Sequence, residues 1–187
     1  MSLDIWIGLP ADLEQRVATL EPHESWPADA EASPQSRDPL WHSISANPPV
    51  FDRKHFPWNS RLYHAAEIPG AGAIASARSM ARFYAHLPDV LSAQALRLAM
   101  TPLVSGVSAL TGDKMRFGPG FQLQIDDRFG PVSEAFGHGG AGGSLHGAWP
   151  DQRIAFSYVP SLLREDGQAN ERTHSLLRAL HASCQPA

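Results

Sequence analysis

The sequence predicts an α+β protein in which helices flank an antiparallel sheet. Apolar and polar residues alternate over 121–125 and 154–159, which is the period of a strand with one buried face. Residues 80–87 and 173–180 instead carry apolar side chains three and four positions apart, as on one face of a helix. Helices come first, four strands follow (121–125, 133–139, 145–149 and 153–159) and a helix ends the chain. This order favours α+β over an alternating parallel fold.

The first sixty residues divide into two parts. An apolar extended piece over 5–9 precedes a helix whose face is formed by Leu13, Val17 and Leu20, and Pro10 suits the start of that helix. Residues 21–60 contain seven of the 16 prolines and keep no period. Their three tryptophans, at 26, 41 and 58, would gain much by burial. We therefore expect 21–60 to be a long irregular segment that packs over a core.

Helix boundaries can be placed in the rest of the chain. Ser76 is a typical N-cap residue, and Pro88 is expected to end the helix that it opens. A second short helix is expected over 92–100, and Asn170 can cap the last one. The predicted inward faces of the first and last of these helices are Met80, Phe83, Tyr84 and Leu87, and Thr173, Leu176, Leu177 and Leu180.

Composition excludes several classes of function. The formal net charge is −4 and no basic run occurs, so a nucleic-acid partner is not expected. No apolar stretch approaches the roughly 18 residues of a membrane span, and no secretory leader is present, so the default compartment is the cytoplasm. The histidines lack metal-ligand spacing and a phosphate-binding loop is absent, so neither a metal nor a cofactor is expected. The lone Cys184 cannot form an internal disulfide.

A glycine-rich run is the most distinctive stretch of the chain. Six of the 15 glycines lie between Gly137 and Gly147, in the sequence Phe-Gly-His-Gly-Gly-Ala-Gly-Gly-Ser over 136–144. Glycine lets backbone approach a ligand or another strand closely. The run leads into residues 145–149, a Pro150-Asp151 turn and the strand over 154–159, so it opens a hairpin of a buried sheet.

This pattern resembles the C-terminal strands of serine β-lactamase-like hydrolases, which include class C β-lactamases, DD-peptidases and family VIII carboxylesterases. In that family a Lys-Thr-Gly or His-x-Gly motif lies on an edge strand of the active site, and His138-Gly139-Gly140 matches it. Residues 66–78 resemble a segment that runs past the active site into a helix, and residues 4–10 give a third match. The three matches follow the family's order. They imply a partial β-lactamase/DD-peptidase-like fold, with residues 1–187 as the C-terminal part of one domain.

The resemblance assigns half of an acyl-transfer site. His138, Gly139, Gly140 and Ala141 would be its site residues, and the Ala141 N–H would be one oxyanion-hole donor. Small-molecule esters or amides are the implied substrates, and histidine in place of lysine favours esters over β-lactams.

The family's other motifs are absent. No Ser-x-x-Lys exists, since Phe51 and Thr111 precede the two lysines by three, and no tyrosine begins a Tyr-x-Asn. We expect the C-terminal portion of a serine hydrolase that is inactive alone and self-associates through an exposed sheet edge. A non-catalytic binding or scaffold protein of the same fold is the alternative. A self-contained hydrolase that uses Ser144 with His138 and His146 is a third hypothesis.

Overall fold

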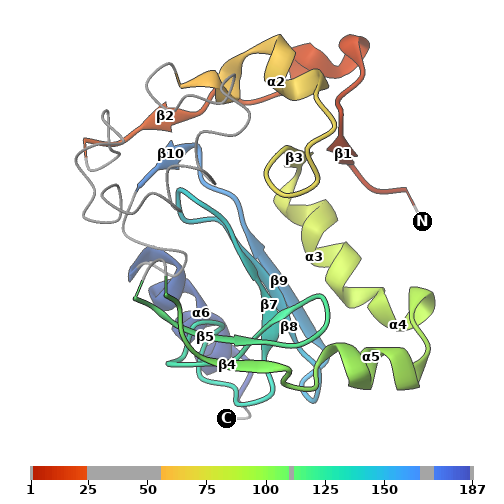
Figure 1. Cartoon of the computed structure of the whole chain (residues 1–187), viewed down its shortest axis with the longest axis vertical. Helices are drawn as coiled ribbons and strands as arrows, with labels where there is room; N and C mark the ends of the chain where they lie inside the picture. Colours follow the sequence, from red (N-terminus) through yellow and green to blue (C-terminus); the bar gives the residue numbers. More distant parts are fainter. Residues whose placement is uncertain (1, 25–55, 110–111, 165–170, 186–187) are drawn as a thin grey trace.

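An antiparallel sheet forms the centre of the protein, as expected, but it has six strands where four were predicted. The computed structural model describes residues 2–24, 56–109, 112–164 and 171–185 (Figure 1). The strands lie in the order β4-β5-β6-β7-β8-β9, so each pairs with its neighbours in the sequence. Their bounds are Val104–Val107, Lys114–Phe117, Gln122–Leu123, Phe136–Gly139, Leu145–Trp149 and Ile154–Tyr158. Strands β4 and β9 form the two edges of this sheet.

The predicted hairpins are confirmed, and the strand before them is shorter than expected. Strands β7, β8 and β9 pair antiparallel, although β7 begins at Phe136 and not at 133 because the Ala135 amide closes a turn onto Val132 O. The strand predicted over 121–125 is reduced to Gln122–Leu123, and Asp126 and Asp127 then adopt positive φ of 47° and 54°. Strands β4 and β5 were not anticipated from the sequence.

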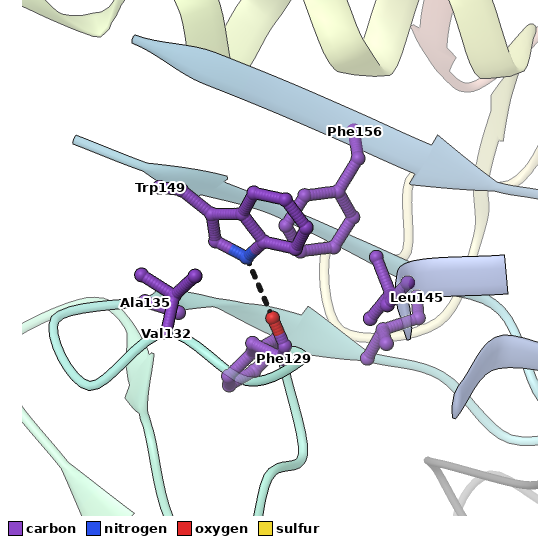
Figure 2. Close-up of a cluster of buried hydrophobic side chains, with 7 residues drawn as sticks. Phe129, Val132, Ala135, Leu145, Trp149 and Phe156 are labelled. Atoms are coloured by element: carbon purple, nitrogen blue, oxygen red, sulfur yellow. Dashed lines mark hydrogen bonds between the residues drawn. The ribbon is translucent and has the colours of Figure 1, made fainter. Parts of the chain in front are cut away.

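One face of the sheet is covered by the last helix, α6 (Glu171–Ser183). Figure 2 shows the core beneath it, where the Trp149 indole donates to the carbonyl oxygen of Phe129 at 2.7 Å. Both residues are fully buried, and Leu177 of α6 closes the cluster. The start predicted at Asn170 lies outside the described residues. The core cluster consists of Phe129, Val132, Ala135, Leu145, Trp149, Phe156 and Leu177.

The opposite face is covered by three helices, α3 (Ala77–Ala85), α4 (Leu87–Val90) and α5 (Ala93–Ala99). Ser76 caps α3 by accepting a bond from the Ser79 amide, as predicted. Pro88 does not end this helix: α3 ends at Ala85, and Pro88 lies in the first turn of α4, where its missing N–H costs nothing. Tyr84 and Leu87 enter the core, whereas Phe83 is 36% exposed and does not.

The N-terminal segment forms a separate ribbon beside α3. Strand β1 (Ile5–Ile7) pairs antiparallel with β3 (Ala73–Ala75), and a 3₁₀ helix, η1 (Ala11–Arg16), follows β1. The helix expected to carry Leu13, Val17 and Leu20 is shorter than predicted: it is a 3₁₀ helix that ends at Arg16, and Val17 is already extended with ψ of 127°. The three side chains still share a surface, since all of them line one cavity.

The remaining short elements connect the ribbon to the far end of the chain. The helices η6 (Pro57–Asn59) and α2 (Arg61–Ala65) precede β3, and β2 (Glu21–Pro22) pairs in parallel with β10 (Leu162–Leu163). Most of the irregular segment expected over 21–60 lies outside the described residues. Within the described ranges, no helix has the length and apolar character needed to cross a membrane.

Candidate active-site strand and adjoining cavity

The glycine run forms the end of β7 and the turn that leads to β8. His138 and Gly139 belong to β7, where His138 lies directly opposite His146 and Gly139 opposite Leu145. The turn is closed by Gly140 N donating to Ser144 O at 2.9 Å and by Gly143 N donating to Gly140 O at 3.2 Å. Ala141 therefore lies in an exposed turn, two residues after the end of β7.

The Ala141 amide is free to donate. Its N–H bonds to no acceptor among the described residues, although the neighbouring turn amides of Gly140 and Gly143 are paired. Gly142 and Gly143 take φ of 86° and 99°, values that a side-chain-bearing residue adopts only with strain. The turn thus presents the unpaired Ala141 donor two residues after the end of β7.

Glycine is required where β7 and β8 face each other at Gly137 and Gly147. A Cβ at Gly137 would lie 2.0 Å from His146 O, and one at Gly147 would lie 2.4 Å from Phe136 O. The strand is also fixed from its other side, because Gly139 N donates to the buried Gln122 side-chain oxygen at 3.0 Å. The sequence pattern placed Gln122 on the solvated face of a strand, but its side chain is buried and holds the glycine strand through this hydrogen bond.

His138 is exposed, and its tautomer follows from its contact. Its Nδ1 lies 2.6 Å from Gly139 O, and a carbonyl oxygen can only accept. Nδ1 therefore carries the proton, and Nε2 of the neutral ring carries a lone pair. Such a nitrogen can accept a proton or bind a cation, but it cannot donate to a substrate carbonyl unless the ring is protonated.

His146 is half-buried beneath the ribbon. Its Nδ1 lies 2.8 Å from Ser157 Oγ on β9, so His138, His146 and Ser157 follow one another across three strands on one face of the sheet. Burial, and then the charge of His138, lowers the pKa of His146 to about 4. A base of such low pKa is a weak partner for a serine nucleophile at neutral pH.

The Ser144 hypothesis gains no geometric support. Within the described part of the chain, Ser144 Oγ forms no hydrogen bond to either histidine. It lies against Gly140 instead, so close that a Cβ added to Gly140 would be 2.3 Å from it. Ser157 does contact His146, but no acidic side chain within the described ranges hydrogen-bonds to that imidazole. The activated nucleophile of an acyl-transfer enzyme needs both contacts.

A cavity of about 430 Å³ lies between the N-terminal ribbon and the sheet. Ser144 and His146 line it from β8, whereas His138, Gly139, Gly140 and Ala141 do not line it. The ribbon contributes mostly apolar groups together with the Arg16–Asp4 ion pair, whose N–O distance is 2.7 Å. The apolar lining includes Trp6, Leu9, Leu13, Leu20, Trp58, Ile74 and Met80.

The two segments that resemble the hydrolase family upstream of the glycine run are brought together at this cavity. Strands β1 and β3 pair, Asp4 N donates to Ser79 Oγ at 2.9 Å, and Ser76 N donates to Asp4 O. Beside them, buried His64 joins Glu14 Oε1 and Trp58 O through its two ring nitrogens, both at 2.7 Å. These bonds hold the outer wall of the cavity.

Neither Tyr63 nor Tyr84 replaces the tyrosine of the missing Tyr-x-Asn motif. The Tyr63 hydroxyl donates to Ala71 O at 2.9 Å, and burial raises its pKa. Burial raises the pKa of Tyr84 to about 12, within an aromatic cluster with Phe121 and Phe136. Among the described residues, no group of three or more His, Cys, Asp or Glu is placed to hold a metal ion.

An antiparallel sheet with helices on both faces and a His-Gly-Gly sequence on a central strand is typical of the class of β-lactamase-like and penicillin-binding hydrolases. The sequence profile of the beta-lactamase family matches residues 3–181, and the chain belongs to that family. The family resemblance and the α+β fold predicted from the sequence are both confirmed.

Known relatives agree with this assignment. The chain is 32% identical to the esterase/beta-lactamase LipL of Mycobacterium tuberculosis over 107 residues. This match covers 52% of the chain and 24% of LipL. Among solved structures, a family VIII carboxylesterase is similar with a TM-score of 0.79 at 26% identity, and EstA of Arthrobacter nitroguajacolicus with 0.77 at 30%. A penicillin-binding protein homologue of Caulobacter crescentus gives 0.74 at 25%. These three matches cover 97% of this chain but only 47%, 50% and 48% of the solved chains.

Proposed function

We propose that this chain carries the carbonyl-binding half of a serine-dependent ester hydrolase and does not turn over esters by itself. The observation that carries the proposal is the glycine strand: an unpaired Ala141 amide follows a histidine whose Nε2 holds a free lone pair. Both groups suit acyl transfer, in which an oxyanion forms and a proton moves between the nucleophile and the leaving group.

Within this proposal, the Ala141 N–H donates to the oxyanion. One such donor lowers the barrier of acyl transfer by about 2.7–4 kcal/mol in enzymes where it has been removed. His138 accepts a proton at Nε2, because Nδ1 is committed to Gly139 O. Gly139 and Gly140 keep the strand free of side chains where substrate would lie, and the Gln122 bond to Gly139 N holds the strand in place.

Esters are the preferred substrate class. Histidine in the third motif is typical of the esterase branch that the sequence resembles, and two of the similar proteins bear esterase names. A neutral imidazole also lacks the fixed positive charge that a lysine would offer to the carboxylate of a β-lactam. The alternative of a non-catalytic scaffold is less favoured, because it requires neither the Ala141 donor nor the His138 proton acceptor three residues before it.

The missing nucleophile accounts for the proposed inactivity. The sequence contains neither Ser-x-x-Lys nor Tyr-x-Asn, and the hydrogen bonds of Ser144 and Ser157 do not supply a substitute. Residues 1–187 would then contribute one side of a site whose other side belongs to further polypeptide of the same domain.

The test uses the DNA immediately upstream of the coding sequence. If it encodes Ser-x-x-Lys in frame, the joined reading frame should hydrolyse p-nitrophenyl butyrate. His138→Ala in that longer protein should lower kcat by about 10²-fold or more, as expected for loss of an acid–base group. His86→Ala, on the exposed junction of α3 and α4, is the matched control and should leave kcat unchanged. Full activity of the His138→Ala enzyme would overturn the assigned role.

A further inference from the structure

We infer that His138 and His146 form an exchangeable two-imidazole site for a divalent transition cation such as Cu²⁺, Ni²⁺ or Zn²⁺. The inference does not depend on the proposed hydrolase function. Its first support is the register of the β7–β8 hairpin, in which the two residues are direct cross-strand partners. Cβ atoms of directly opposed residues lie about 4.5–5.5 Å apart on the same face of a sheet. One ion at about 2.0–2.1 Å from each ligating nitrogen can bridge rings attached at that spacing.

The second support is the hydrogen bonding of the two Nδ1 atoms. His138 Nδ1 donates to Gly139 O at 2.6 Å, and His146 Nδ1 lies 2.8 Å from Ser157 Oγ. Metal-binding histidines commonly donate their second ring nitrogen to a carbonyl or another acceptor, which fixes the ring and directs the lone pair of Nε2 to the ion. Both Nε2 atoms are without a hydrogen-bond partner among the described residues.

The third support is the chemistry of the two side chains. A cation binds the neutral form of imidazole, and binding displaces any ring proton. Imidazole nitrogens favour Cu²⁺, Ni²⁺ and Zn²⁺ over Mg²⁺ and Ca²⁺, which prefer oxygen ligands.

The environment limits the site to two protein ligands. Ser144 and Met80 line the cavity beside His146. Of the described residues that line the cavity, Asp4 alone carries a carboxylate, and it is paired with Arg16. Water would complete the coordination, so the cation exchanges and does not hold the fold together. A bound ion would occupy His138 Nε2, the atom that accepts a proton under the proposed function.

Isothermal titration of the purified chain with Cu²⁺, Ni²⁺ and Zn²⁺ tests the site, with Mg²⁺ as the negative cation. We expect one tight site per chain, and His138→Ala or His146→Ala should each weaken its binding at least tenfold. Ser157→Ala should weaken it by about 10–100-fold, as for outer partners of other metal ligands. His86→Ala, whose ring contacts Asp89, is the matched control and should leave the tight site unchanged.

A second measurement keeps the test independent of the variants' folding. In the unmodified chain, long-range ¹H–¹⁵N spectra should show Zn²⁺ shifting the Nε2 signals of the same two histidines before those of any other. Tight binding that survives both single alanine variants, first shifts at other histidines, or no tight site would each overturn the proposal.

Discussion

Replacing Trp149 by phenylalanine should destabilise the chain by about 2–4 kcal/mol. The indole is fully buried, and its Nε1 donates to Phe129 O at 2.7 Å. Without this donor the buried carbonyl loses its partner, which costs about 1–3 kcal/mol. The indole also packs onto Gly130, where an added Cβ would lie 2.8 Å from its Cζ2. Phenylalanine leaves that space empty, at a further cost of about 1 kcal/mol.

Urea unfolding followed by circular dichroism at 222 nm measures this loss. The midpoint should fall while the slope m stays constant, and Tm should drop by roughly 5–15 °C for a chain of this size. Trp6→Phe, on half-buried β1, is the matched control and should cost less than about 1 kcal/mol. A Trp149→Phe loss below about 0.5 kcal/mol would refute the view that this indole anchors the core beneath α6.

Three further predictions concern the glycine strand, the cavity wall and the sheet edge. Gly137→Ala should cost more than about 2 kcal/mol because its Cβ would lie 2.0 Å from His146 O, whereas Gly70→Ala meets nothing within 4 Å; equal unfolding free energies would contradict this. The pKa of Glu14 is lowered, first by its bond to His64, so the stability that the ionised carboxylate contributes is present above the usual pKa of 4.5 and is lost as pH falls through the folded pKa. Glu14→Gln should therefore flatten the decline in Tm between about pH 5 and about pH 3, and an unchanged decline would contradict this. Val104 and Val107 on edge strand β4 are 61% and 69% exposed, so the chain should self-associate in sedimentation velocity runs and a Val104→Lys, Val107→Lys variant should do so less; a monomeric parent chain with a sharp, high-temperature melt would contradict this.

The sequence predicted those elements in which turn residues and the spacing of apolar residues match the packing in the folded chain. The Pro150-Asp151 turn and the alternation over 154–158 fixed the β8–β9 hairpin, and the Leu177 face placed α6 on the sheet. Strands β4 and β5 were missed because each has only four residues and none of these residues is fully buried, so no buried face imposes a pattern. The helical spacing of Leu13, Val17 and Leu20 misled because a 3₁₀ helix followed by extended chain can also direct these residues into one cavity.

The sequence predicted which segments form the candidate site, but not which of their residues face each other. The glycine run identified β7 and its turn, but the pairing of His138 with His146 depends on a register that sequence spacing does not give. Gln122 alternates with apolar residues like a solvated side chain, yet it is buried because the backbone of β7 supplies it with a donor. Tertiary hydrogen bonding decided both positions.

Hydrolysis of p-nitrophenyl butyrate and of nitrocefin by the purified chain tests the central claim most directly. Intact-mass analysis after treatment with a serine-reactive fluorophosphonate should accompany it. A chain that carries only the carbonyl-binding half of the site should give no turnover above that of its His138→Ala variant and no mass increase. Turnover together with stoichiometric labelling of Ser144 or Ser157, abolished by alanine at that serine, would contradict the account.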